Sequence, residues 1–302
     1  MPDLLIGPEQ IGYDLEFDAA NQTVLVDFRD PRFITAAIAA DFNRFSVAAF
    51  QTVNSLSPEV TEADALAWAT VKLYYAAFYS GHALMRLLGE SCSHFDRVHV
   101  TRIIALATAI GKLPSFNIDS GLYHCIVSPA TTAITCRRAR GSVGGTHEAF
   151  WQLFGAQIQT LSGEILRGPL RPVDAQAVFS QLQLFLRIIR KSGAYAHSWL
   201  SVVRNDLQYR HRFGVWYPTS IRKREREVLA RLADQWRRDP MEVDLAAPRN
   251  GDLGAFVVGC AFVLALCRSL LVRIAERSTA GSRGFMNYGP IGYFNHAGLI
   301  VQ

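Results

Sequence analysis

The sequence has few charged residues, and its cysteines follow no recognisable spacing. Only 19% of its 302 residues are charged, whereas 50% are hydrophobic. This composition excludes a disordered chain, because there is ample apolar surface to bury. The five cysteines are odd in number and scattered, and none forms a CxxC pair. The sequence therefore signals neither a disulfide framework nor a cysteine-based zinc site, and we expect buried, reduced thiols.

Long apolar runs are lacking as well. The longest, from Gly254 to Cys267, spans about 14 residues, whereas a membrane helix needs about 20, so we expect a buried core helix. The first residues, MPDLLIGPEQ, show no basic stretch followed by an apolar run. We therefore expect no secretion signal, no membrane contact and a cytoplasmic location. The net charge of +5 and the basic residues 221–238 fit either an RNA-backbone surface or an ordinary solvated helix face.

A β-hairpin is expected near the N-terminus. Polar and apolar residues alternate in Tyr13–Phe17 and in Thr23–Phe28, on either side of the turn-like residues 19–22. This two-residue period is typical of half-buried strands. We expect the hairpin to be the largest β element of the protein.

Helical patterns dominate the rest of the chain. A second helix follows the helix-start residues Thr61 to Asp64 and ends at Gly89, which is suited to a left-handed C-cap. The remaining helices are expected over residues 33–55, 98–111, 146–167, 173–191, 197–211, 221–237 and 252–277. The sequence thus predicts a mostly α fold, a helical bundle with a small N-terminal β-hairpin.

Two segments are harder to assign. In residues 113–145, the runs LYHCIV and TTAITCRR fit either two short strands around Ser128-Pro129 or irregular structure. The glycine-rich and aromatic tail is expected to be ordered coil. We divide the chain into residues 1–58, with the hairpin and a helix, residues 59–278, the helical core, and residues 279–302, the tail.

The segment Ser201 to Arg212, SVVRNDLQYRHR, holds the residues best suited to chemistry. Arg204 and His211 are seven positions apart, so they share one face of a helix and lie about 10 Å apart along its axis. This separation is too long for both to hold one phosphate within a straight helix. A shared site requires either two copies across a two-fold axis or a chain that folds back near His211.

These residue types are the ones that metal-independent RNA cleavage needs. A group with a pKa of about 7 must move the proton of the ribose 2′-hydroxyl or of the leaving oxygen, which suits His211. A permanent cation must hold the scissile phosphate, which suits Arg204. Asn205 is placed to bind the phosphate or to orient the histidine. The candidate substrate-binding residues are Tyr209, Arg210 and Arg212, of which the tyrosine can stack on a base.

Two features of the sequence resemble HEPN domains. Arg204-Asn205, followed by a spacer and His211, looks like the RxxxxH-type signature in its longer form, with six residues between arginine and histidine. The run Lys72 to Phe78, KLYYAAF, followed by Ala83-Leu84, is similar to the aromatic helix that precedes the catalytic helix in that family. Together these features cover residues 60–215.

The resemblance implies a helical bundle, usually a homodimer, in which the two Arg/His motifs meet at the dimer interface. It also implies metal-independent endoribonuclease activity, often in a toxin or anti-phage defence effector, with RNA as the substrate and no cofactor. Other members lack the histidine. A second interpretation is therefore a non-catalytic binding or assembly protein that contacts nucleic acid or a protein encoded in the same operon.

Other side chains have simpler interpretations. The aromatic residues Tyr74 to Tyr79 recur at helical spacing and are expected to be core. His82 and His147 are expected to be surface or capping residues. His94 and His99 lack the spacing of paired ligands on a helix, so no metal site is expected.

Overall fold

The computed structural model describes residues 12–56, 62–128, 133–139, 145–191, 193–217, 220–246, 251–278 and 288–298. Its contacts divide the chain into two compact units, which we call the sheet unit (residues 1–42 and 82–146) and the helical unit (residues 43–81 and 147–302). The division falls within α1 (Pro31–Asn54) and α2 (Leu66–Leu87), and each of these helices contributes to both units. The three-part division made from the sequence stays a prediction.

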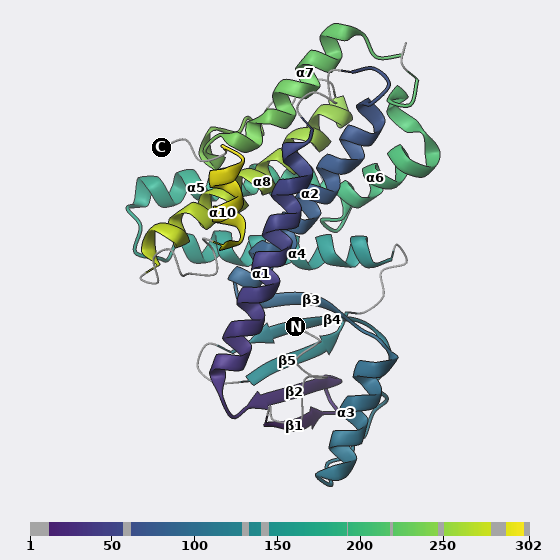
Figure 1. The fold of residues 1–302 in the computed structure, drawn as a ribbon, viewed down its shortest axis with the longest axis vertical. Coiled ribbons are helices and arrows are strands. Elements are labelled where there is room, and N and C mark those ends of the chain that lie inside the picture. The colour runs from purple at the N-terminus through teal and green to yellow at the C-terminus, as the bar shows by residue number, and fades with distance from the viewer. Residues whose placement is uncertain are drawn as a thin grey trace. The chain divides into compact units, whose positions relative to one another are not determined.

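The sheet unit is built on an antiparallel five-stranded sheet of order β1-β2-β5-β4-β3 (Figure 1). Its strands are β1 (Tyr13–Asp18), β2 (Thr23–Phe28), β3 (Glu90–Phe95), β4 (Gly121–Val127) and β5 (Ala133–Arg138). The expected hairpin is confirmed as the β1–β2 pair. The two-strand interpretation of residues 113–145 is confirmed by β4 and β5. The expectation that the hairpin is the largest β element is wrong, because it pairs with β5 and so becomes the edge of the larger sheet.

One face of the sheet carries the core of this unit. Val24, Val26 and Phe28 of β2 pack with Ile103 and other apolar residues of α3 (Arg97–Ala109). α3 begins at Asp96, whose carboxylate accepts hydrogen bonds from the backbone of Val98 and His99, while the His99 ring completes a capping box. His99 therefore has a structural partner at a helix start.

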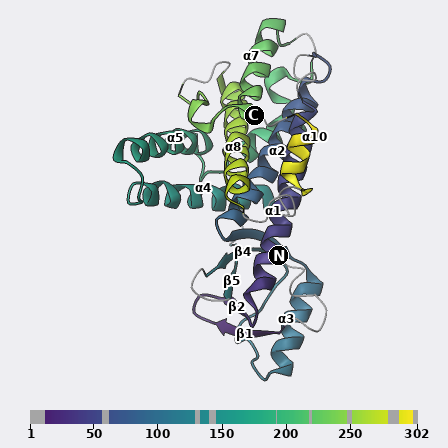
Figure 2. The same cartoon turned by 60° about the vertical axis from the view of Figure 1, so that its left-hand side comes forward.

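The helical unit contains the remaining helices. They are α4 (Thr146–Ile165), α5 (Pro172–Arg190), α6 (Trp199–Arg210), α7 (Lys223–Asp234), α8 (Gly251–Arg277) and α10 (Pro290–His296). Every helix expected from periodicity is present, with ends shifted by a few residues. α8 runs through the middle of the unit with α5, α6 and α7 packed on it (Figures 1 and 2).

The described part of the tail differs from the expected coil. Pro290 opens α10, and Phe294 on this helix is fully buried, with its ring 4.6 Å from the ring of Phe50. A buried contact between Phe294 and Phe50 thus stabilises this short helix. Its sequence shows no helical spacing of apolar residues, so it was not expected from the pattern alone. The rest of the tail, Thr61 and Pro129 lie outside the described residues.

Two helices, α1 and α8, are long and apolar enough to cross a membrane by length and composition alone. In α8, 67% of the most apolar window is buried inside the protein. The core helix of a soluble protein can be equally long and apolar, so these two helices are weak evidence for a membrane. The cytoplasmic location stays a prediction. All five cysteines are free and buried, as expected.

Candidate functional site

The predicted motif lies on α6 and on the turn that follows it. α6 ends where His211 adopts the left-handed conformation, with φ 50° and ψ 34°. The chain then turns through Arg212–Gly214, and the indole of Trp216 donates a hydrogen bond to the carbonyl of Leu207 at 2.6 Å. A carbonyl in the last turn of a helix lacks a partner within that helix, so this bond holds the returning chain against α6. The helix therefore ends at the predicted histidine, and the chain folds back there.

Arg204 is buried beneath aromatic rings of α2. Its guanidinium carbon lies 5.4 Å from the ring centre of Tyr74 and 5.9 Å from that of Tyr75, and the residue is 6% exposed. Its Nη1 donates to Oε1 of Gln208 at 3.4 Å. Its Nε is buried without a hydrogen-bond partner among the described residues. Because an unpaired buried N–H is costly, an acceptor that reached this atom through a local opening of the site would be bound favourably.

Tyr74 joins Arg204 to a histidine. The Tyr74 hydroxyl lies 3.0 Å from Nδ1 of His147, and it accepts a hydrogen bond from the indole of Trp151 at 3.0 Å. With Trp151 donating to the phenol oxygen, the hydroxyl proton is left to donate to Nδ1, which places the imidazole proton on Nε2. α2, α4 and α6 therefore bring a tyrosine, a histidine and an arginine to one place in the helical unit.

The electrostatics of this group favour a neutral histidine. Burial, together with the positive charge of Arg204, lowers the pKa of His147 to about 4. Burial also raises the pKa of the Tyr74 hydroxyl, against the opposing effects of Trp151 and Arg204. An anion bound at Arg204 would offset its charge and raise the pKa of His147, since an opposite charge favours the protonated imidazole. The histidine would thus become a better proton acceptor when a phosphate is present.

The other predicted residues lie toward the exposed end of α6. The buried carboxylate of Asp206 accepts hydrogen bonds from Nη1 of Arg210 at 2.9 Å and from Nη1 of Arg212 at 3.0 Å. The two arginine side chains are still 64% and 59% exposed. Tyr209 is 69% exposed, and Asn205 is half-buried. Asp206 thus fixes two cations at the surface, a role that the sequence did not suggest.

His211 lies on an aromatic surface. Its ring centre is 5.3 Å from that of Trp216, which meets Trp68 of α2 edge to face, also at 5.3 Å. Trp68 is 53% exposed and Tyr217 is 57% exposed. We name this region the aromatic–basic surface, made of Trp68, Tyr209, Arg210, His211, Arg212, Trp216 and Tyr217.

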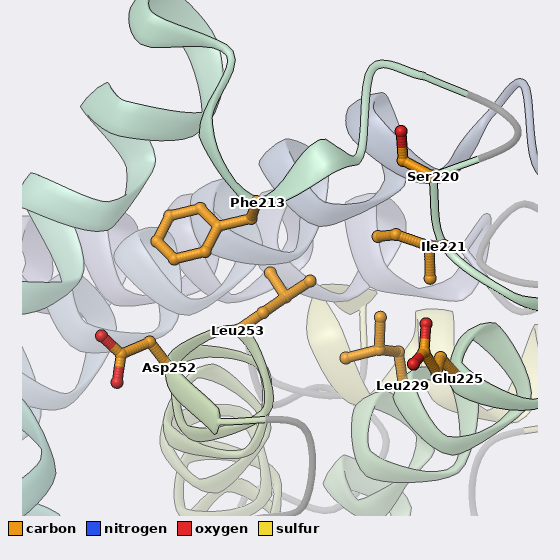
Figure 3. Close-up of a pocket in the computed structure, with 7 residues that line it drawn as sticks. All are labelled: Phe213, Ser220, Ile221, Glu225, Leu229, Asp252 and Leu253. Carbon is orange, nitrogen blue, oxygen red and sulfur yellow. The ribbon is translucent and has the colours of Figure 1, made fainter.

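A pocket of about 310 Å³ lies beside the same turn (Figure 3). It is lined by Phe213, Ser220, Ile221, Glu225, Leu229, Asp252 and Leu253. Phe213 has φ 69°, a strained conformation for an aromatic residue. Its charged lining groups are the carboxylates of Glu225 and Asp252, and Asp252 is paired with the Lys191 ammonium. The lining therefore offers a phosphate no cation of its own.

The structure separates residues that the sequence grouped together. Among the described residues, no hydrogen bond joins Arg204 to His211; the arginine lies with Tyr74, and the histidine with Trp216. His147, expected to be a surface or capping residue, is half-buried in the Arg204 group. It stands 73 positions from Tyr74, so no local pattern links them.

His82 also differs from the expectation. It is buried on α2, with its Nδ1 3.1 Å from Nη1 of Arg86, which forms an ion pair with Asp41. The histidine is inside because this stretch of α2 is buried on nearly every side.

In the part of the chain that the structure describes, no group of three or more His, Cys, Asp and Glu residues is placed to hold a metal ion.

Comparison with known proteins found no relative of this chain. No family model matches it, and no curated protein or solved structure matches it either. The resemblance to HEPN domains therefore rests on the residues quoted above.

Proposed function

We propose that this chain is a metal-independent endoribonuclease of the HEPN type that binds the scissile phosphate at Arg204. The observation that carries the proposal is the buried Arg204 guanidinium, whose Nε has no partner among the described residues, beside the neutral ring of His147. A fixed cation and a histidine are the groups that this cleavage requires. A role as a toxin or anti-phage defence effector, in the cytoplasm, follows from the resemblance alone.

In the proposed reaction, the 2′-hydroxyl attacks the adjacent phosphorus and expels the 5′-oxygen of the next nucleotide. The products are a 2′,3′-cyclic phosphate and a 5′-hydroxyl. Arg204 holds the non-bridging oxygens and stabilises their added charge. The Tyr74 hydroxyl passes its proton to Nδ1 of His147 as it takes up the 2′-hydroxyl proton, so His147 is the final acceptor. His211 of a second copy donates a proton to the leaving oxygen. Asn205 is assigned a supporting role at the phosphate.

The aromatic–basic surface suits unpaired RNA. A base stacked on an aromatic side chain gains about 1–3 kcal/mol. Arg210 and Arg212, one on either side of His211 in the chain, are each paired with Asp206. Exposed Lys223 and Arg224 at the start of α7 add positive charge to the same unit. We therefore expect cleavage in single-stranded segments.

The test is cleavage of a labelled RNA in excess EDTA. Arg204→Met keeps apolar bulk against Tyr74 and removes the charge, His147→Gln removes the base, and His211→Asn keeps a residue that tolerates the left-handed conformation. Each variant is expected to lose at least about 100-fold in rate. Arg171→Met, at an arginine whose side chain is 85% exposed, is the matched control and should cut at the wild-type rate. Loss of wild-type cutting in EDTA, or full cutting by Arg204→Met, would contradict the proposal.

A non-catalytic binding or assembly protein is the second candidate. It is favoured by the depth of Arg204, which is 6% exposed and packs against two tyrosines as a core residue does. In that case the wild type binds RNA or a protein partner without cutting. RNA binding that weakens with salt and is lost when Arg210 and Arg212 are changed to glutamine would identify RNA as its ligand.

A further inference from the structure

Two cysteines face each other in the middle of the sheet. Cys125 on β4 is paired directly with Cys136 on β5. The backbone N–H of Ala139 donates to the carbonyl of Leu122, and that of Ser128 donates to the carbonyl of Ala133. Hydrogen-bonded and non-hydrogen-bonded pairs alternate along an antiparallel ladder, so these two bonds make Cys125–Cys136 a non-hydrogen-bonded pair.

This pairing class brings side chains close together. Directly opposed residues of a non-hydrogen-bonded pair have Cα atoms about 4.5 Å apart, and disulfides span Cα separations of about 4.4–6.8 Å. Both side chains point to the core face of the sheet, where the two residues are 1% and 3% exposed. The register and the shared buried face therefore place the two thiols within the reach of a disulfide.

The surroundings distinguish Cys125 from the other thiols. The hydrogen bond from Cys136, with further help from Ser91 and the charge of Arg86, lowers the pKa of Cys125 despite its burial. Burial raises the pKa of Cys92 and Cys267 to about 12. A thiolate is the reactive form of cysteine, so Cys125 is the thiol best prepared to react.

We propose that Cys125 and Cys136 are a redox-modifiable pair that hydrogen peroxide converts into a disulfide. The Cys125 thiolate attacks one peroxide oxygen, the O–O bond breaks, and the hydroxide that leaves takes up a proton to become water. The Cys136 sulfur then attacks the sulfur of the Cys125 sulfenic acid, the S–O bond breaks, and a second water leaves with the Cys136 proton. Two electrons from the two sulfurs reduce one peroxide to two waters.

The burial of the pair selects the oxidant. Hydrogen peroxide is close in size to water and uncharged, so it can enter a closed core during small fluctuations. Glutathione disulfide is a bulky, charged tripeptide dimer and has to reach the sulfur in line with its own S–S bond. Peroxide should therefore oxidise the native protein much faster than glutathione disulfide does.

The test uses the full chain, folded and reduced. The protein is exposed to graded hydrogen peroxide, quenched with catalase, denatured in N-ethylmaleimide and digested with trypsin. Cys125 and Cys136 fall in one tryptic peptide, residues 113–137, because no Lys or Arg lies between them. We expect this peptide to lose two hydrogen atoms and to carry no maleimide, while Cys92, Cys260 and Cys267 are alkylated. Dithiothreitol should restore both thiols.

Two variants check the order of the steps. In Cys136→Ser, peroxide should leave a Cys125 sulfenic acid that dimedone traps, whereas the matched control Cys260→Ser should form the disulfide as the wild type does. The proposal is overturned if peptide 113–137 keeps two alkylated thiols at peroxide concentrations that oxidise a free cysteine. Over-oxidation of Cys125 without a cross-link, or a disulfide with another cysteine, overturns it as well. The wild-type measurement decides the question even if a variant fails to fold.

Discussion

At the scale of single residues, the surroundings of His147 lower the pKa of its ring. Its ring is held by Tyr74 and lies within the field of Arg204, so the folded protein keeps it neutral with a pKa of about 4 instead of 6.5. Between pH 6.5 and pH 4, His147 binds a proton in the unfolded chain but not in the folded chain. The contribution of His147 to the free energy of unfolding is therefore fully present well above pH 6.5 and is lost as the pH is lowered toward 4.

We expect this titration to be measurable in the free energy of unfolding. A shift of this size corresponds to at most about 3 kcal/mol in total. Only part of it is lost between pH 7 and pH 5, because the folded-state pKa lies lower still. Solvent screening of the partly exposed ring reduces that part to about 1 kcal/mol. Urea denaturation of the wild type and of His147→Gln at both pH values is the measurement. The variant should lose less stability than the wild type over this range. Equal losses in the two proteins would show that His147 is not held neutral.

At the scale of elements, α4 carries two glycines in contrasting settings. A Cβ on Gly155 would lie 2.5 Å from Cβ and Cγ of His197, whereas a Cβ on Gly163 would meet only the mobile end of Arg167, at 3.5 Å. The turn that contains His197 thus packs so closely on α4 that only glycine fits at position 155. The glycine at position 163 has no such contact and only lowers helix propensity.

Alanine at each position should therefore have opposite effects. Gly155→Ala is expected to lower the free energy of unfolding by about 1–3 kcal/mol, because the clash must be relieved by moving the turn. Gly163→Ala is expected to raise it by up to about 1 kcal/mol. Chemical denaturation of the two variants beside the wild type measures both. Stabilisation by Gly155→Ala would mean that His197 does not pack on α4.

Elements differ in how far the sequence predicted them. Helices such as α8 follow from local periodicity, which needs no distant partner. β3 was missed because its sequence, ESCSHF, places Ser91 and Ser93 on the buried face, which hides the apolar alternation. The motif spacing identified Arg204, but its neighbours Tyr74 and His147 come together only through the packing of three helices. No local pattern encodes that packing.

At the scale of the whole molecule, the proposed site needs two copies of the chain. Arg204 is buried with α2 and α4, whereas His211 is exposed at the end of α6. In a two-fold dimer the exposed histidine of one copy can approach the Arg204 group of the other, and the same contact then occurs twice. Each copy is thus expected to supply the part that the other lacks.

The most direct test of this claim is to mix two inactive variants. Arg204→Met and His211→Asn, carrying different tags, are co-expressed, the mixed dimer is purified, and RNA cleavage is measured in EDTA. A site composed of Arg204 from one copy and His211 from the other leaves one of two sites intact, so the mixed dimer should cut at about half the wild-type rate. A mixed dimer as inactive as its parents would contradict the shared site.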